Sequence, residues 1–221
     1  MTRGVIIAVV GAESTGKTTL AHGLAQALAE AGHDAVVVHE TLREFCERHS
    51  RTPTQAEQAD IAAQHSLRIE QAAQQHGVVV ADTTALMTAV YSDLIFGDHS
   101  LYAQALAWHQ QASVTLLTAL DLPWVPDGHQ RDGPHVQRPV DDRVRRALIK
   151  AGVGFTVVSG QGSARLKVAV DLALGVLKPP EPGQAPEAST PRWQWVCDDC
   201  DVPDAHASGL ITGLRRPSLQ A

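Results

Sequence analysis

The fold of this chain is decided by one stretch of its sequence, Gly11-Ala12-Glu13-Ser14-Thr15-Gly16-Lys17-Thr18. The spacing of its glycine, lysine and hydroxyl residues is that of a phosphate-binding loop. The apolar residues 5–10 before it predict a buried strand, and residues 19–28 after it predict a helix. Because a phosphate loop connects a strand to a helix, this context favours a genuine loop over a chance glycine-rich turn.

The residues of this loop have distinct chemical tasks. Gly11 and Gly16 let the backbone curl so that its N–H groups point at phosphate oxygens, and the following helix adds the positive end of its dipole. Lys17 can reach the β- and γ-phosphates of ATP, and the Thr18 hydroxyl can bind Mg²⁺. The predicted phosphate-binding set comprises Gly11, Glu13, Ser14, Thr15, Gly16, Lys17, Thr18 and Thr19.

Length and composition limit the classes of protein to which the chain can belong. Its 221 residues suffice for one α/β domain and a small appendage. The net charge of −6 argues against nucleic acid or an anionic membrane as a partner. No apolar run approaches the length of a membrane span, so we expect a cytoplasmic protein, and three cysteines are too few for a disulfide framework.

Apolar, strand-like runs recur between helical segments. They lie at residues 5–10, 35–38, 78–81, 114–118 and 155–158. This alternation predicts a three-layer α/β fold in which helices cover both faces of a five-stranded parallel sheet. By analogy with small P-loop kinases, we expect the strand order 2-3-1-4-5 of a P-loop NTPase.

The remaining segments predict helices, a lid and an appendage. Residues 54–75 contain no helix breaker and predict one long helix with Thr54 as its N-cap, and shorter helices are expected near residues 84–94 and 101–111. The segment 122–139 is rich in proline and glycine and predicts an irregular lid without regular structure. We expect a folded domain at residues 1–177, a proline-rich linker at 178–192 and a tail at 193–221.

Two carboxylates follow strands of the predicted sheet. Asp82 ends one strand, a typical place for an acidic residue that holds Mg²⁺, although it could instead cap the next helix. Glu40 follows the strand at residues 35–38 and could accept a proton from an acceptor hydroxyl, bond a sugar diol, or be a solvated residue at a helix start. Because the carboxyl ends of parallel strands converge, we expect both carboxylates near the phosphate loop.

Arginine and aromatic residues complete the predicted site. Arg131, Arg138 and Arg143 could fold over the triphosphate, where planar guanidinium groups match the charge of the transferring phosphoryl group, although loop arginines are more often solvated. Trp124 and Tyr91 could stack on a flat, cationic heterocycle, although packing in the core is the commoner role of an aromatic residue.

Four segments together resemble one family, the ribosylnicotinamide kinase domain of NadR-type proteins. They are GAESTGKTTL at residues 11–20, HETLREF at 39–45, ADTTALMTAVYSDLIFG at 81–97 and DLPWVPDGHQRD at 121–132. The resemblance implies ATP-dependent, Mg²⁺-dependent phosphorylation of the ribose 5′-hydroxyl of nicotinamide riboside. Longer NadR proteins carry an adenylyltransferase domain before the kinase strand, so a chain that starts at that strand is expected not to make NAD itself.

The resemblance also implies roles for individual residues. Its pattern assigns phosphate and Mg²⁺ binding to Gly16, Lys17 and Thr18, metal binding to Asp82, the substrate side to Glu40 and Arg43, and the lid and crevice to Trp124, Asp127 and Arg131. With the residue-level reasoning, the predicted catalytic residues are Lys17, Glu40, Asp82 and Arg131, the acceptor contacts are Glu40, Arg43, Tyr91, Trp124 and Asp127, and Arg138 is a further phosphate contact.

Other interpretations remain open at the level of sequence. The chain could be a nucleotide-dependent switch or ATPase module without a small-molecule acceptor, or a kinase for another nucleoside or a sugar. The preference between ATP and GTP is undetermined, as is the oligomeric state, and a homo-oligomer is compatible with the sequence. In the tail, Cys197 and Cys200 could bind Zn²⁺ together with His206 and a nearby acid, Asp201 or Asp204, but a mobile extension with reduced thiols is the favoured interpretation.

Overall fold

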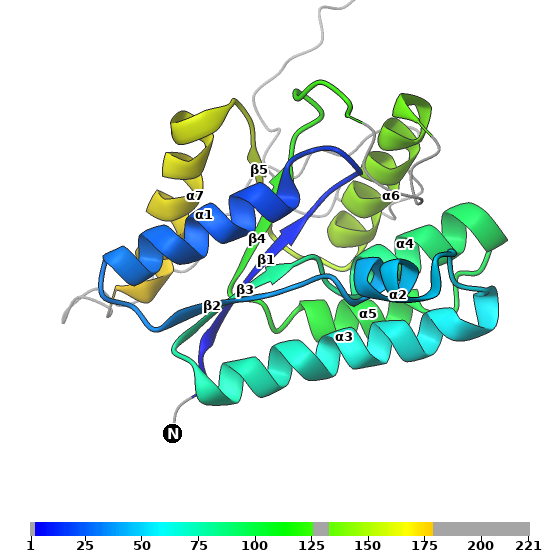
Figure 1. Ribbon diagram of the computed structural model, residues 1–221, viewed down its shortest axis with the longest axis horizontal. Helices are drawn as coiled ribbons and strands as arrows, with labels where there is room; N and C mark the ends of the chain where they lie inside the picture. The colour runs from blue at the N-terminus through cyan, green and yellow to red at the C-terminus, as the bar shows by residue number, and fades with distance from the viewer. Residues whose placement is uncertain (1–2, 126–132, 179–221) are drawn as a thin grey trace, which may run out of the picture. The chain divides into compact units, whose positions relative to one another are not determined.

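The computed structural model describes residues 3–125 and 133–178 of the chain. Its centre is a five-stranded parallel sheet with the strand order β2-β3-β1-β4-β5 (Figure 1). The strands are β1 (Val5–Val10), β2 (Ala35–Val38), β3 (Val78–Asp82), β4 (Val114–Thr118) and β5 (Thr156–Val158). The predicted fold class and strand order are therefore confirmed.

Helices connect the strands and cover both faces of the sheet. They are α1 (Lys17–Glu30), α2 (Thr41–His49), α3 (Gln55–Gln75), α4 (Ala85–Phe96), α5 (Tyr102–His109), α6 (Gln137–Lys150) and α7 (Gly162–Leu177), with a 3-10 turn, η2 (Pro134–Val136), before α6. In Figure 1, α1 and α7 lie on one side of the sheet, and α3, α4 and α5 lie on the other.

Alternate residues of β1 point to opposite faces of the sheet, and helices cover both faces. Ile7 and Val9 pack with side chains of α1 and α7, whereas Ile6 packs with α3 and Val10 packs with α4 and α6. All four side chains are fully buried. A strand that is buried on both faces gains nothing from polar residues, which is why it appears in the sequence as a continuous apolar run.

The start of α3 agrees with its prediction. Thr54 is the N-cap residue, and a capping box joins it to Glu57, whose carboxylate accepts hydrogen bonds of 2.8 Å from both the backbone N–H and the hydroxyl of Thr54. These contacts satisfy donors that the first turn of a helix otherwise leaves without partners.

The segment 122–139 differs from its prediction of wholly irregular structure. Residues 134–136 form η2, and α6 begins at Gln137, so Arg138 and Arg143 lie in a helix and not in a loop. Two of the prolines that suggested a broken segment, Pro134 and Pro139, occupy the first turns of these helices, where a residue without an N–H group is tolerated. Arg145 and Arg146 belong to α6, as expected.

Some predictions concern residues outside the described ranges. They include Asp127, Arg131, nearly all of the proposed linker, and the tail with Cys197 and Cys200. These predictions, and the division of the chain at residue 177, stay predictions; α7 itself ends at Leu177.

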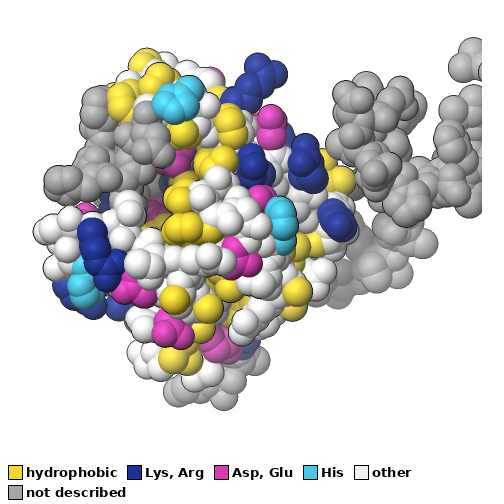
Figure 2. Space-filling view, turned by 90° about the vertical axis from the view of Figure 1, so that its right-hand side faces the viewer, with side chains coloured by type: hydrophobic (Ala, Val, Ile, Leu, Met, Phe, Trp, Pro, Cys, Tyr) yellow, Lys and Arg dark blue, Asp and Glu magenta, His cyan; other side chains and the backbone are white. Residues whose placement is uncertain are grey.

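The described surface mixes side chains of different kinds. Figure 2 shows a face on which hydrophobic side chains run from the top through the centre, acidic side chains are scattered, and several basic side chains gather toward the upper right. Within residues 3–125 and 133–178, no helix is both long enough and apolar enough to span a bilayer.

Candidate functional site

The loop between β1 and α1 has the backbone conformation that its glycines predict. Gly11 has a φ of 146°, and a side chain at this position would collide with the Thr118 hydroxyl at the end of β4. Gly16 is the N-cap residue of α1 and has a left-handed φ of 74°, which is strained for residues other than glycine. Both positions therefore require glycine for backbone reasons.

Hydroxyl groups hold this loop together from inside. The Thr15 hydroxyl donates to the carbonyl oxygen of Ala12 at 2.7 Å, and its Oγ1 lies 2.6 Å from Oγ1 of Thr118. The Thr118 hydroxyl in turn donates to the carbonyl oxygen of Val10 at 3.3 Å. Lys17 Nζ donates to the Ala12 carbonyl at 2.7 Å, so its ammonium group lies over the loop to which it belongs.

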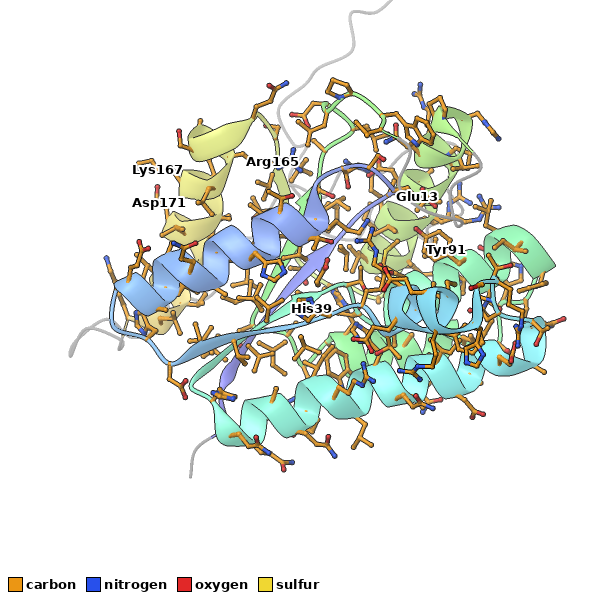
Figure 3. All side chains as sticks on the ribbon, in the orientation of Figure 1. Glu13, His39, Tyr91, Arg165, Lys167 and Asp171 are labelled. Atoms are coloured by element: carbon orange, nitrogen blue, oxygen red, sulfur yellow. The ribbon has the colours of Figure 1, made fainter. Side chains whose placement is uncertain are left out.

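Side chains and backbone from later parts of the chain hold the loop from outside. Gln137 at the start of α6 donates to the Glu13 carbonyl at 2.7 Å, and Arg165 of α7 donates to the Thr15 carbonyl, also at 2.7 Å. Between them, the Ser14 hydroxyl donates to the Val125 carbonyl at 2.5 Å. Figure 3 shows Glu13 and Arg165 near opposite ends of the loop. Three consecutive loop residues are thus tied to three different segments.

Asp82 ends β3, the strand next to β1, where it is paired in register with Val9. Asp82 is 3% exposed, and its Oδ1 has no hydrogen-bond partner within the described part of the chain. The alternative role as a helix cap is wrong, because Thr84 is the N-cap residue of α4 and its hydroxyl accepts from Leu86 N. A buried carboxylate oxygen without a partner is the kind of ligand that a hard cation such as Mg²⁺ would complete.

Glu40 lies beyond β2, the strand next to β3 on its other side. The last registered pair of these two strands joins Val38 to Ala81, so Glu40 and Asp82 both lie at the carboxyl edge of the sheet. Glu40 occupies the N-cap position of α2, but its side chain makes no capping hydrogen bond. Both Glu40 and Arg43, in the first turn of α2, are half-buried. A fully solvated helix start is therefore not what the structure shows.

Two buried histidines lie close to the end of β3, and sequence reasoning missed both. His65 on α3 lies 3.1 Å from the Thr41 hydroxyl and 3.4 Å from the Thr83 hydroxyl, and His109 on α5 lies 2.9 Å from the Thr84 hydroxyl and 3.0 Å from the Thr115 hydroxyl. Burial lowers the pKa of each histidine to about 4, so both rings are neutral at pH 7.

The aromatic residues predicted for the acceptor side and the arginines predicted for the triphosphate differ in their contacts. Tyr91 of α4 is half-buried between the apolar clusters of α4 with α6 and of α2 with α3. Trp124 is half-buried, and its Nε1 is buried without a hydrogen-bond partner among residues 3–125 and 133–178. Arg138 is exposed in the first turn of α6. Arg143 forms an ion pair with Asp93 of α4 at 3.1 Å. This contact holds Arg143 against α4, which does not favour the predicted lid role.

Thr18 and Thr19 begin α1 and complete the phosphate side, with Thr18 half-buried and Thr19 exposed. A protein-only metal cage is not present: the described ranges contain no group of three His, Cys, Asp or Glu side chains placed to hold an ion. Thr18 and Asp82 carry oxygen atoms of the hard kind that Mg²⁺ prefers, and this ion typically takes its remaining ligands from water and phosphates. The two side chains therefore fit Mg²⁺ when a bound nucleotide supplies the other ligands.

Comparisons with known proteins give a family match and structural likenesses. Residues 6–165 match the family described as the AAA domain, which covers most of the chain. No curated protein has a sequence that matches the chain.

Solved structures extend the comparison at low sequence identity. Crystal structures of NadR protein, one in complex with NAD and AMP-PNP and one in complex with NR, each superpose with a TM-score of 0.61 and 19% identity over 78% of this chain. The chain spans about half the length of those NadR chains, which are covered to 49% and 51%. Thymidylate kinase from Ehrlichia chaffeensis superposes with a TM-score of 0.56 and 18% identity over 80% of this chain and 100% of its own. At these identities the likeness establishes the fold.

Proposed function

The chain belongs to the AAA domain family, and from this premise we propose that it transfers a phosphoryl group from ATP to a hydroxyl of a small nucleoside-type acceptor. One observation carries the proposal. The phosphate loop, Asp82 and Glu40 follow three neighbouring strands, β1, β3 and β2, at the same edge of the sheet. This order would place a donor site, a metal ligand and an acceptor-side carboxylate next to one another, as phosphoryl transfer requires.

The phosphate side would bind ATP through the loop between β1 and α1. Its backbone N–H groups and the N-terminus of α1 favour the negative charge of the phosphates. Lys17 is held at the loop by the Ala12 carbonyl, from which its flexible side chain can turn to the β- and γ-phosphates. Arg138, and Arg131 outside the described ranges, are the proposed further cations for the triphosphate.

Thr18 and Asp82 would hold Mg²⁺ beside the phosphates. When bound, the ion neutralises charge on the phosphoryl oxygens during transfer. Asp82 is suited to this role because its Oδ1 is buried and unpaired within the described residues, which costs free energy until a cation completes it.

On the acceptor side, Glu40 would accept the hydroxyl proton, and Arg43 would orient the acceptor. We propose nicotinamide riboside as the first acceptor to test, with Tyr91, Trp124 and Asp127 around its base. Support comes from the resemblance to NadR-type kinase domains and from the likeness to NadR protein solved with NR. The nicotinamide ring of this acceptor is cationic, and the faces of aromatic side chains attract cations.

The test is to incubate the purified full chain with ATP and Mg²⁺ and a panel of nucleosides that includes nicotinamide riboside, and to detect products by mass. We expect a product heavier by one phosphate group with one acceptor and little ADP without it. ADP release that is independent of every acceptor would instead identify an ATPase or switch module. Replacing ATP by GTP in the same assay measures the donor preference.

A further inference from the structure

His65 connects the ends of two neighbouring strands. It lies in the middle of α3, is 2% exposed, and uses one ring nitrogen for each contact: Nδ1 with the Thr41 hydroxyl at 3.1 Å and Nε2 with the Thr83 hydroxyl at 3.4 Å. Thr41 directly follows Glu40, and Thr83 directly follows Asp82. A single rigid ring therefore joins the neighbours of the two carboxylates of the proposed site.

This connection lies where the sheet no longer holds the two segments together. The registered pairs of β2 and β3 end with Val38 and Ala81. Beyond that pair the chains diverge, β2 into α2 and β3 into the turn before α4. The position of Glu40 relative to Asp82 then depends on side-chain contacts, and the two made by His65 reach both segments.

The backbone after Asp82 needs such support. Thr83 has a φ of 73°, in the left-handed region that a β-branched residue avoids, and it is 1% exposed. A conformation of this kind persists only where its surroundings hold it in place, and it is common at functional sites. The Thr83 N–H donates to the Val9 carbonyl of β1 at 3.0 Å, and His65 of α3 contacts the Thr83 hydroxyl.

The contact on the other side is also reinforced. Arg68, one turn after His65 on α3, pairs with Glu44 of α2 at 2.6 Å, and its Nη1 lies 3.4 Å from the Thr41 hydroxyl. The first turn of α2, and with it the backbone of Glu40, is thus anchored to α3.

We propose that His65 is a positioning residue that sets the distance between Asp82 and Glu40, and so places the metal ligand and the proton acceptor for transfer. The role rests on the proposed kinase function. His65 itself takes no part in the chemistry, because its ring is enclosed and both ring nitrogens already have partners.

The chain contains a matched control in His109. It is also fully buried, and its two nitrogens also contact two threonine hydroxyls, those of Thr84 and Thr115. Neither threonine directly follows Glu40 or Asp82. A loss of stability from removing a buried histidine should therefore appear in both variants, and a loss of positioning only in one.

The experiment compares His65→Phe and His109→Phe in the full chain, with the nucleoside panel and a Mg²⁺ titration. For His65→Phe we expect kcat to fall by roughly 10- to 100-fold, as a displacement of about 1 Å can cause, and the half-saturating Mg²⁺ concentration to rise several-fold. His109→Phe should show a similar loss of Tm with kcat within about twofold of the wild type. Equal kcat and Mg²⁺ requirement in the two variants would overturn the proposal.

Two further variants protect the test against misfolding. His65→Gln keeps a donor and an acceptor and should recover part of the lost kcat. Thr41→Val removes the hydroxyl with little change of shape and leaves the His65 ring in place. We expect it to lower kcat several-fold. A folded Thr41→Val protein with wild-type kcat would contradict the proposal.

A binding measurement separates this proposal from the proposed function. If the wild type phosphorylates no acceptor, calorimetry can still measure how much Mg²⁺ tightens ATP binding. We expect this enhancement to be several-fold smaller in His65→Phe and to be kept in His109→Phe. An equal enhancement in both would overturn the role of His65, and a wild type without any Mg²⁺-dependent ATP binding would overturn both proposals.

Discussion

Arg165 Nη2 donates a 2.7 Å hydrogen bond to the carbonyl oxygen of Thr15, which lies 150 residues earlier in the chain. The guanidinium group is buried and also contacts the Gly160 carbonyl and the Asp121 carboxylate, each at 3.2 Å. The Asp121 carboxylate accepts in turn from Gly160 N at 2.5 Å. One charged side chain therefore connects the phosphate loop to the segments after β4 and β5.

We expect Arg165→Met to weaken ATP binding by about tenfold and to lower the free energy of unfolding by about 1–3 kcal/mol. The reason is that the Thr15 carbonyl loses its charged donor and the loop loses an anchor on α7. Calorimetry with ATP and thermal unfolding measure the two effects. Lys167→Met is the control on the same helix, since Lys167 is exposed and its ion pair is with exposed Asp171, so both quantities should stay close to wild type. Unchanged ATP affinity in a folded Arg165→Met protein would contradict this role.

Lys17→Ala should abolish phosphoryl transfer and leave the fold intact. A point charge at the β- and γ-phosphates is lost from the site, and one such electrostatic contact is worth on the order of a hundredfold or more in rate. Product formation by mass and the Tm are the measurements. Lys150→Ala, which removes an exposed lysine at the end of α6, is the matched control and should be fully active. Near-normal turnover in folded Lys17→Ala would refute the proposed function.

The two carboxylates at the sheet edge should give different phenotypes. Asp82→Asn is expected to raise the Mg²⁺ concentration needed for half-maximal rate, so that added metal restores part of the activity. Glu40→Gln is expected to lower kcat with the acceptor and to leave ATP affinity within about twofold of wild type. Initial rates over a matrix of Mg²⁺ and acceptor concentrations separate the two. Equal losses of ATP affinity in both variants would argue against this division of roles.

Stability should fall in mild acid because of the buried histidines. Burial lowers the pKa of His109 from 6.5 to about 4, so between these values the unfolded chain binds a proton that the folded chain does not. Unfolding then becomes easier as pH decreases, by about 1.4 kcal/mol per pH unit for this one residue. Chemical denaturation from pH 7 to pH 4.5 measures the slope. In His109→Gln the slope should be smaller by that amount, and an identical slope would show that His109 does not contribute.

The sheet was predictable from sequence because its strands are mostly apolar, and the central strands β1 and β3 are buried on both faces. The runs at residues 5–10 and 35–38 contain no polar residue and coincide with β1 and β2, and the run at 114–118 coincides with β4 although it contains Thr115 and Thr118. The phosphate loop was equally predictable, because Gly11 and Gly16 have conformations that only glycine adopts without strain.

The contacts around the loop were not predictable in the same way. Arg165 and Gln137 are polar residues on helices, and nothing local distinguishes them from solvated neighbours. Their roles follow from hydrogen bonds to residues more than 120 positions away in the chain. His65 lies in a helix rich in alanine and glutamine, where its spacing from neighbouring residues carries no signal. Asp82 could be placed at the edge of the sheet, but only the structure shows that Thr84 takes the capping role and leaves Asp82 available.

Trp124→Ala should raise the KM for the acceptor more than the KM for ATP. Trp124 is half-buried, beside Val125, whose carbonyl binds the Ser14 hydroxyl of the phosphate loop, so it lies close to the site. Stacking of its ring on a cationic pyridinium is worth roughly 0.5–2 kcal/mol, which corresponds to a change of about 2- to 30-fold in acceptor affinity. Trp124→Phe should recover part of the loss, because a smaller aromatic face remains. Trp108→Ala is the control: Trp108 is also half-buried but packs with Ile6 and Ile69 under the sheet, so it should lower Tm and leave both KM values unchanged. If Trp124→Ala behaves like Trp108→Ala, Trp124 is a packing residue and the base of the acceptor is bound elsewhere.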